Sequence, residues 1–323
     1  MSIAADFAQT LHTGQQPETA RALRPAPCPS LQESLQDIRV AVFDVYGTLI
    51  NYWKEEFGNE ARKEQSLRDA FAKTIGYFKL TDALIHMNPD EAPAKTLYDL
   101  YHGLIALKHG LAAGKGVSLP EIKIEQVWET ILLMCKRHGF DYAAAIRGTE
   151  SDCACCMAYY YNFFAIGRQL YPGVYEALRT LREKNILLGI VSNAQFYTPI
   201  DLTLLLRDSS RGTLDDYNEL FENDLVFYSY EYGVSKPDNG LFRKLFDALY
   251  ELQILPSQTV FVGNDFTNDI GPAQKNNMKT ALFTGDDRVV FNNGACGGIT
   301  PDLVFEQWSS LPDLLSFHHK EQV

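Results

Sequence analysis

The stretch "VFDVYGTLI", residues 42–50, decides the fold. With the residues before it, it forms a short apolar, β-branched run that reaches Asp44 and then turns at Gly47 and Thr48. Such a run, closed by a turn, predicts a buried strand over 39–44. Because open α/β sheets bind ligands beyond the carboxyl ends of their strands, the sequence places a carboxylate where chemistry is expected.

The chain after "YPG" (171–173) alternates between two kinds of segment. Helical patterns cover 174–185, 198–208, 237–252 and 267–276, and buried-strand patterns cover 186–193, 224–233, 259–265 and 279–285. Alternating buried strands and helices predict a parallel sheet with helices on both faces. Together with the strand at 39–44, they predict an α/β, doubly wound, Rossmann-like core.

The region between the first strand and this alternation has a different pattern. Helical periodicity covers 60–78, 95–110, 118–139 and 152–167, and no convincing strand interrupts it. Ser118 and Glu121 stand at capping-box spacing. We therefore predict three parts: an N-terminal tail (1–38) that lies against the main domain, an α/β core (39–51 and 169–323) and an inserted all-helical domain (52–168).

Composition and charge exclude several classes of function. The formal net charge of −12 argues against a nucleic-acid or anionic-membrane partner and leaves a small anionic substrate open, with the oligomeric state undecided. No apolar run approaches the roughly 20 residues that span a bilayer, and the start of the chain does not resemble a signal peptide. The six scattered cysteines are expected to be free thiols, and "DCACC" (152–156) fits structural zinc spacing poorly. These observations predict a cytoplasmic protein.

Polar residues follow four of the predicted strands. They are Asp44, Ser192 with Asn193, Lys236, and Asn264 with Asp265, after which Asp269 comes four residues later. One polar residue after a strand is usually a helix cap, but four such strand ends are hard to explain by capping alone.

The residue types at these strand ends suit one reaction centre. Asp44 is a candidate nucleophile toward phosphorus or carbon, and Lys236 is a candidate to steady it and to neutralise the substrate. Thr48 or Ser192 could hydrogen-bond an oxyanion, and Gly47 permits the sharp turn beside the nucleophile. Asp44, Asp265 and Asp269 are candidate ligands of Mg²⁺, which prefers carboxylate oxygens.

Four motifs resemble those of the haloacid dehalogenase-like hydrolase superfamily. They are "VFDVYGTL", "IVSN", "SKPD" and "FVGNDFTND", in the order and spacing of that family. The resemblance implies Asp44, Lys236, Ser192 and Asn193 as catalytic residues, and Gly47, Thr48 and Asn193 as residues near the substrate. It also implies that the helical insertion is a large cap domain that closes over the site.

Tyr46 leaves the reaction type open. Phosphatases of this family carry a second aspartate there as general acid–base, whereas a tyrosine is typical of the family's 2-haloacid dehalogenases, which need no metal. A dehalogenase also needs an arginine from the cap, and Arg62 or Arg68 lies roughly where one would look. The simpler explanation for either arginine is that it belongs to an exposed, charged face of a helix.

Asp265 and Asp269 point the other way, because paired acids suit a cation, to which Tyr46 would add its backbone carbonyl. The family's usual aspartate after the glycine is, however, Asn264 here. Three hypotheses follow: a Mg²⁺-dependent phosphatase, narrowly favoured; a metal-independent 2-haloacid dehalogenase-type hydrolase; and a non-catalytic binding protein with the same fold.

Overall fold

The computed structural model of the chain describes residues 2–14, 22–29, 31, 33–54, 60–290 and 298–316. They fall into two compact units. A helical unit comprises Met1–Glu18, Trp53–Arg168 and Gln195–Asp201, and an α/β unit comprises Thr19–Tyr52, Gln169–Ala194 and Leu202–Val323. The helical insertion predicted over 52–168 thus differs by one residue from the second segment of the helical unit.

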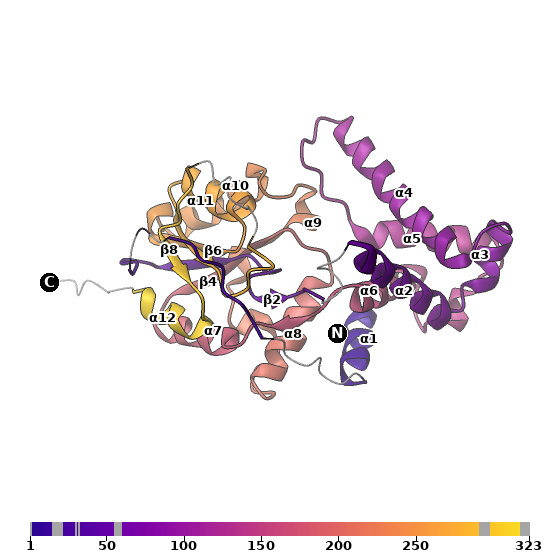
Figure 1. Cartoon of the computed structure of the whole chain (residues 1–323), viewed down its shortest axis with the longest axis horizontal. Helices are drawn as coiled ribbons and strands as arrows, with labels where there is room; N and C mark the ends of the chain where they lie inside the picture. The colour runs from indigo at the N-terminus through magenta and orange to yellow at the C-terminus, as the bar shows by residue number, and fades with distance from the viewer. Residues whose placement is uncertain are drawn as a thin grey trace. The chain divides into compact units, whose positions relative to one another are not determined.

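A six-stranded sheet forms the centre of the α/β unit (Figure 1). Its strands are β1 (Val40–Phe43), β4 (Leu187–Ser192), β5 (Val226–Tyr228), β6 (Thr259–Gly263), β7 (Lys279–Phe283) and β8 (Leu303–Phe305). They lie in the order β5-β4-β1-β6-β7-β8, and each neighbouring pair is parallel. Because β1 lies between β4 and β6, the residue that follows it reaches the middle of the carboxyl edge.

Helices cover both faces of this sheet, as Figure 1 shows. The side chains of Ala41 and Phe43 pack with α7 (Val174–Glu183), α8 (Thr198–Ser209) and α12 (Leu311–Leu314). Val40 and Val42 point to the opposite face and pack with α10 (Asn239–Glu251) and α11 (Gly271–Lys275). Every residue of β1 is buried because successive side chains enter alternate cores, which confirms the doubly wound α/β prediction.

The sheet differs from the predicted elements in three places. The strand expected over 224–233 ends at Tyr228, and a short helix, α9 (Ser229–Tyr232), follows. The edge strand β8 was not predicted, since only three residues form it. A small antiparallel pair, β2 (Ile50–Asn51) with β3 (Gln169–Leu170), also lay below the length that a sequence pattern can identify.

Short helical turns connect several of these elements. They are η2 (Tyr142–Ala144), η3 (Tyr217–Glu219), η4 (Asn223–Leu225), η5 (Pro256–Gln258), the π-helical η6 (Phe266–Ile270) and η7 (Trp308–Ser310). The helix expected over 267–276 is therefore a π-helical turn that continues into α11.

The helical unit contains α1 (Ile3–Thr13), α2 (Glu60–Phe78), α3 (Thr81–Met87), α4 (Pro93–Ala113), α5 (Ile124–Arg137) and α6 (Glu150–Ala165). The aromatic run of α6 is core: Tyr161 stacks on Phe71 with 4.2 Å between ring centroids, and Trp128 lies 5.7 Å from Tyr161. Helix α6 packs on α1, α2 and α5, so its side chains organise this unit.

The N-terminal segment differs from the single tail that was predicted. Helix α1 belongs to the helical unit, where Phe7 lies against Tyr77, Phe78 and Tyr160. The described residues between 22 and 52 belong to the α/β unit, where the Ala26 N–H donates to the Thr284 carbonyl. Helix α1 belongs to the helical unit because the Phe7 side chain packs against the aromatic core of that unit.

The capping box predicted at Ser118 and Glu121 is wrong. Helix α5 begins only at Ile124, and the Glu121 carboxylate accepts a hydrogen bond from Gln195 Nε2 at 2.9 Å. A capping box is present instead at the start of α6, where Thr149 and Asp152 each bond the other's backbone N–H. An acid three residues after a hydroxyl is a common pattern, and tertiary partners decide which copy is used.

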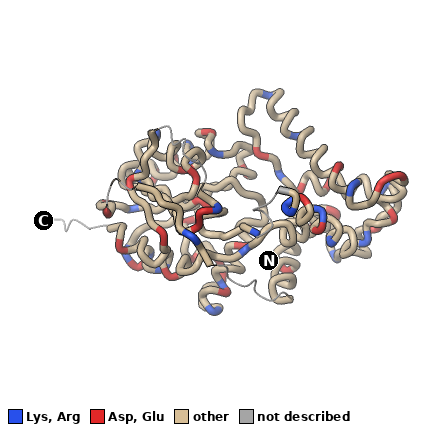
Figure 2. The backbone as a smooth tube through the Cα atoms, in the orientation of Figure 1, with Lys and Arg blue, Asp and Glu red and all other residues tan. Residues whose placement is uncertain are grey.

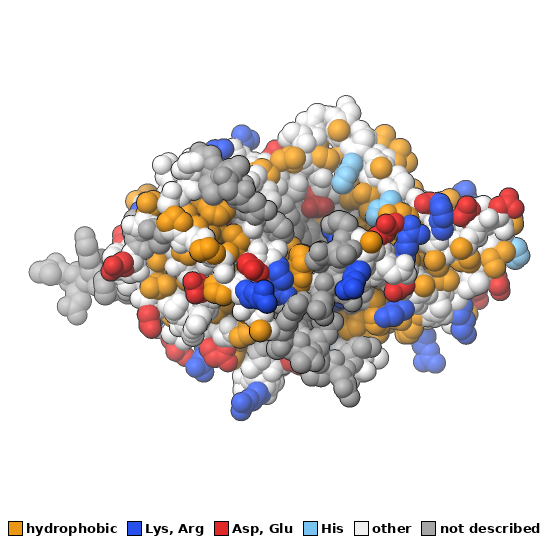
Figure 3. All heavy atoms as spheres, viewed as in Figure 1, with side chains coloured by type: hydrophobic (Ala, Val, Ile, Leu, Met, Phe, Trp, Pro, Cys, Tyr) orange, Lys and Arg blue, Asp and Glu red, His pale blue; other side chains and the backbone are white. Residues whose placement is uncertain are grey.

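Charged residues of both signs are interspersed along the backbone of both units (Figure 2). On the face shown in Figure 3, hydrophobic side chains lie in small groups among them. Of the helices in the described residues, none is long and apolar enough to cross a membrane. Cys135, Cys153, Cys155 and Cys156 are free thiols, and Cys28 Sγ donates to the Pro29 carbonyl. Cys296 lies outside the described residues.

A buried ion pair lies where the helical unit's segments end. Arg168 Nε donates to Asp201 Oδ2 at 3.0 Å, and the Tyr159 hydroxyl donates to Asp201 Oδ1 at 2.8 Å. Asp201 has no exposed surface, and the Arg168 guanidinium lies over the Tyr159 ring. Removing one charge of a buried pair leaves the other without compensation, which costs more than the pair itself contributes.

We therefore expect Asp201→Asn to lower the free energy of unfolding by about 3–5 kcal/mol, because the Arg168 charge stays buried. Urea denaturation followed by circular dichroism measures this. The matched control is Asp99→Asn, which breaks the exposed i,i+4 pair with Lys95 and should leave the midpoint nearly unchanged. Equal midpoints for the two variants would show that the buried pair is not a stabilising feature.

Candidate active site

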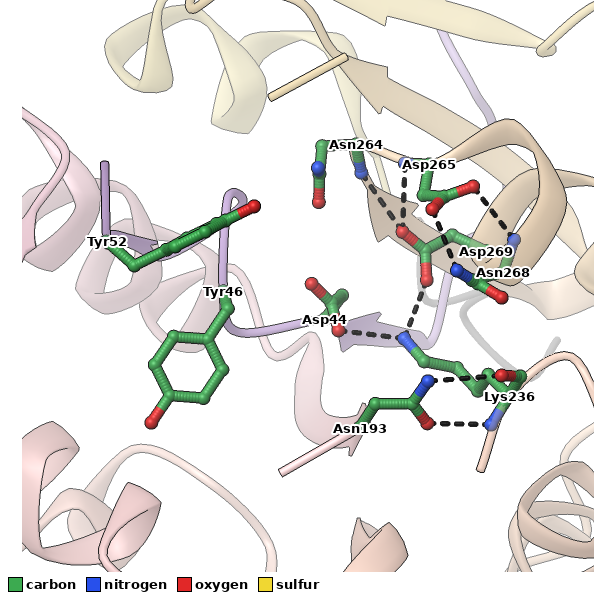
Figure 4. Close-up of a pocket in the computed structure, with 9 residues that line it drawn as sticks. All are labelled: Asp44, Tyr46, Tyr52, Asn193, Lys236, Asn264, Asp265, Asn268 and Asp269. Atoms are coloured by element: carbon green, nitrogen blue, oxygen red, sulfur yellow. Dashed lines mark hydrogen bonds and ion pairs between the residues drawn. The ribbon is translucent and has the colours of Figure 1, made fainter. Parts of the chain in front are cut away.

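Asp44 lies at the centre of the site (Figure 4) and is held there by groups from two strands and one loop. Its backbone N–H donates to the Val262 carbonyl on β6 at 3.0 Å. The Ser192 hydroxyl, at the end of β4, donates to Asp44 Oδ1 at 3.0 Å, and Lys236 Nζ donates to the same oxygen at 2.8 Å. Asp44 is only 6% exposed, so its carboxylate is held in place, and it lines a pocket that a substrate could enter.

The turn after Asp44 depends on Gly47 and Thr48. Gly47 has φ +85°, and a Cβ there would lie 2.7 Å from Asn264 Nδ2, so only glycine fits. The Thr48 hydroxyl lies 2.9 Å from Asn264 Oδ1 and 3.4 Å from Asp44 Oδ2. Thr48 and Ser192 have no exposed surface, so in this structure their hydroxyls orient Asp44 from behind.

Asn193 positions Lys236 through its backbone. Asn193 Oδ1 accepts the Lys236 N–H at 2.6 Å, and Asn193 Nδ2 donates to the Lys236 carbonyl at 3.1 Å. This paired contact joins the end of β4 to the loop that carries the lysine. The Lys236 side chain then extends to the carboxylates as a buried cation.

Asp269 shares the Lys236 ammonium with Asp44. Lys236 Nζ donates to Asp269 Oδ1 at 2.6 Å, while the N–H groups of Asn264 and Asp265 donate to Asp269 Oδ2 at 3.1 and 3.0 Å. Gly263 permits this approach, since a Cβ there would lie 2.4 Å from the Asp269 carboxylate. The Asp269 side chain is thus bonded at both oxygens.

Burial and charge act in opposite directions on this cluster. Burial raises the pKa of the Asp269 carboxyl to about 7, although the Lys236 ammonium lowers it. Burial also disfavours the charged form of Lys236, but Asp269 and Asp44 outweigh it, and the pKa of Lys236 lies above its usual value. The lysine therefore stays charged, and Asp269 is the group of this pair that can exchange a proton near neutral pH.

Asp265 caps the helical turn that follows it. Its Oδ1 accepts the N–H groups of Thr267 and Asn268 at 2.7 and 3.0 Å, and its Oδ2 accepts Asn268 Nδ2 at 2.8 Å. Both oxygens are therefore used inside the protein. This is the capping role that an aspartate before a helix commonly takes.

The predicted Mg²⁺ ligands already take part in hydrogen bonds and ion pairs within the protein. Asp265 and Asp269 accept protein hydrogen bonds at every carboxylate oxygen, and Asp44 is paired with an ammonium. Asn264 adds only a neutral amide, whose two ends bond Thr48 and the Val289 carbonyl. Within the described residues, no group of three or more His, Cys, Asp or Glu side chains is arranged to hold a metal ion.

Two tyrosines lie on the side of Asp44 away from Lys236 in Figure 4. Tyr46 and Tyr52 meet edge to face, with 6.2 Å between ring centroids and 89° between the planes. The Tyr46 hydroxyl points away from Asp44, whereas the Tyr52 hydroxyl points toward the Asp44 and Asn264 side of the pocket. Burial, and then the charges of Asp44, Asp265 and Asp286, raise the pKa of Tyr52 to about 12, so its phenol stays protonated.

These residues enclose one pocket of about 150 Å³ within the α/β unit. It is lined by Asp44, Tyr46, Tyr52, Asn193, Lys236, Asn264, Asp265, Asn268 and Asp269. The structure thus brings together the predicted residues of all four motifs. Tyr52 and Asn268 were missed; Tyr52 follows the first motif closely, but nothing in the sequence fixes its direction.

Arg62, the predicted substrate-binding arginine, is not among the residues that line this pocket. It is an exposed residue of α2 in the helical unit. Arg68 on the same helix pairs with Glu64 at 2.7 Å in an exposed i,i+4 contact. That contact agrees with the simple helix-face explanation for Arg68, and the role of Arg62 stays a prediction.

The comparison with solved structures found several similar chains, one of which has a TM-score above 0.5. A 2-haloacid dehalogenase from Pseudomonas syringae pv. tomato DC3000 has 19% sequence identity and a TM-score of 0.52, covering 86% of this chain and 97% of the other. A HAD phosphatase from Thermococcus onnurineus has 14% identity and a TM-score of 0.45, covering 85% and 97%. The L-2-haloacid dehalogenase from Xanthobacter autotrophicus has 18% identity and a TM-score of 0.42, covering 86% and 98%.

Sequence comparison gives the family directly. No curated protein matches the chain. The family model described as haloacid dehalogenase-like hydrolase matches residues 38–277, which is more than half of the chain and includes all four motifs. With the parallel sheet and the polar residues at its carboxyl edge, this match shows that the chain belongs to the haloacid dehalogenase-like hydrolases.

Proposed function

We propose that this hydrolase is metal-independent and uses Asp44 to displace a leaving group from carbon in a small anionic substrate, as a 2-haloacid dehalogenase would. One observation carries the proposal: Lys236 Nζ lies between Asp44 and Asp269, and the other acid of the pocket is used as a helix cap. The carboxylates that would bind a cation are thus already balanced by an ammonium and by backbone N–H groups.

The position of Tyr46 supports displacement at carbon. A phosphate ester releases an alkoxide, which needs a proton, and general acid help is worth about 10²–10⁴-fold in rate. A halide leaves as a stable anion and needs no proton. The Tyr46 hydroxyl points away from Asp44, so this side chain is a poor replacement for the acid of a phosphatase.

The proposed reaction has two steps. An Asp44 carboxylate oxygen attacks the carbon that bears the halogen, the carbon–halogen bond breaks, and the halide leaves with the electron pair. Water then adds to the carbonyl carbon of the resulting Asp44 ester, and cleavage of the acyl carbon–oxygen bond releases a 2-hydroxy acid and restores Asp44. One proton from water is released overall, and Asp269, with a pKa of about 7, is suited to accept it.

The pocket favours a small substrate with one carboxylate. A volume of about 150 Å³ accommodates only a few non-hydrogen atoms beside the lining residues. An ammonium has three hydrogens, and Lys236 donates two of them to Asp44 and Asp269. The third is a charged donor for a substrate carboxylate.

A Mg²⁺-dependent phosphatase is the second candidate. One observation favours it: Asp44, Asp265 and Asp269 line the same pocket. Its cation would have to share carboxylates that already accept protein hydrogen bonds at both oxygens. For that reason we rank it below the metal-independent reaction.

We expect the purified protein to release chloride from 2-chloropropionate at the same rate with and without EDTA, because no step uses a metal. Chloride titration and detection of lactate by chromatography measure the reaction. p-Nitrophenyl phosphate should stay intact with or without added Mg²⁺. Phosphatase activity that EDTA abolishes, without chloride release, would replace this proposal with the second candidate, and inactivity toward both substrates would favour a binding protein.

We also expect Asp44→Asn to reduce halide release by at least about 10³-fold, because an amide is a poor nucleophile. In ¹⁸O-labelled water, wild-type turnover should place the label in the Asp44 carboxylate, which peptide mass spectrometry detects. The control is Asp247→Asn on the exposed side of α10, which should behave as wild type. Full activity of Asp44→Asn, or label found only in the product after many turnovers, would exclude Asp44 as the nucleophile.

A further inference from the structure

The hydrogen-bond donors that line the pocket differ in whether they already donate to another group of the protein. Asn193 Nδ2 donates to the Lys236 carbonyl, Asn264 Nδ2 to the Val289 carbonyl, and Asn268 Nδ2 to Asp265. Lys236 has two of its three hydrogens on carboxylates. Among the described residues, Tyr52 has a hydroxyl that faces the pocket and has no hydrogen-bond partner.

The position of Tyr52 is set by the β2–β3 pair and by contact with Tyr46. It directly follows β2, whose pairing with β3 sets the path of the backbone. Ile50 of β2 is fully buried, and the Tyr171 N–H donates to the Leu49 carbonyl at 3.0 Å beside the pair. The Tyr52 and Tyr46 rings pack edge to face, with 6.2 Å between their centroids. A ring held at its base and side has little freedom to turn its hydroxyl out of the pocket.

We propose that the Tyr52 hydroxyl donates a hydrogen bond to the leaving halide while the carbon–halogen bond breaks; this inference rests on the dehalogenase function proposed above. Lys236 and Tyr52 lie on opposite sides of Asp44 in Figure 4. The ammonium suits the substrate carboxylate, which is charged throughout. A neutral donor suits the halogen, which becomes an anion only as the bond breaks, so the hydrogen bond strengthens in the transition state.

The chemistry of a phenol fits this role without proton transfer. The halide departs with the electron pair of the broken bond, and Tyr52 keeps its proton throughout. Burial, and then the charges of Asp44 and Asp265, raise the pKa of the Tyr52 phenol, so the phenol remains a donor across the working pH range. Tyr52 therefore acts as a residue that determines leaving-group preference.

The test is a leaving-group series with Tyr52→Phe, which keeps the ring that packs on Tyr46. Because fluoride accepts stronger hydrogen bonds than bromide, kcat for 2-fluoropropionate should fall by about 10²-fold, and kcat for 2-bromopropionate by at most about 10-fold. KM should change little for either substrate, since the contact is made chiefly in the transition state. Halide release is measured with ion-selective electrodes.

The matched control is Tyr250→Phe, which removes a hydroxyl from a side chain of α10 that is 79% exposed and should change neither rate nor preference. Equal losses for the two halides, or a rise in KM with kcat unchanged, would overturn the inference, because both indicate a structural or carboxylate-binding role. A changed preference in Tyr46→Phe but not in Tyr52→Phe would also overturn it.

The possible outcomes distinguish failure of the proposed Tyr52 role from failure of the proposed dehalogenase function. Wild-type protein that releases no halide from any of these substrates overturns both. Wild-type protein that releases halide, with a Tyr52→Phe variant of unchanged preference, overturns only the role of Tyr52. Thermal unfolding of Tyr52→Phe at the wild-type temperature ensures that altered kinetics reflect the hydroxyl.

Discussion

The site depends on one buried ammonium held between two buried carboxylates. Lys236 Nζ lies 2.8 Å from Asp44 and 2.6 Å from Asp269, and all three side chains are at most 9% exposed. Burying three charges is costly unless each finds a partner, so their geometry leaves little freedom. The surrounding polar groups, Asn193 on the lysine backbone and two N–H groups on Asp269, supply the remaining hydrogen bonds.

This arrangement also limits the chemistry. The Lys236 ammonium beside Asp44 and Asp269 offsets part of the negative charge of these two carboxylates. The acids that a cation would use are satisfied within the protein: one by the lysine and backbone, the other as the cap of a π-helical turn. The family match shows a hydrolase of the haloacid dehalogenase-like type. We expect the hydrogen-bond donors at the carboxyl edge of the sheet to influence which bond it can break.

Several features were predictable because they depend on local pattern. The buried strand at 39–44, the alternation after residue 171 and the helical run on either side of Phe71 follow from hydrophobic periodicity. Asp44, Asn193, Lys236 and Asp269 were predicted to meet because parallel strands bring their carboxyl ends to one edge. Short elements such as β8 and β2 were not predictable, since two or three residues carry too little pattern to separate a strand from a loop.

The sequence by itself determined the architecture: an α/β sheet with an acid at the end of its first strand and a helical insertion after it. Only the tertiary structure decided that Asp265 is a cap, that Asp269 receives the lysine, and that Tyr52 rather than Tyr46 directs its hydroxyl toward Asp44. The physical reason is that strand order follows from periodicity along the chain. The direction of a side chain and the partner of each hydrogen bond depend on residues far apart in sequence, as Lys236 and Asp44 are.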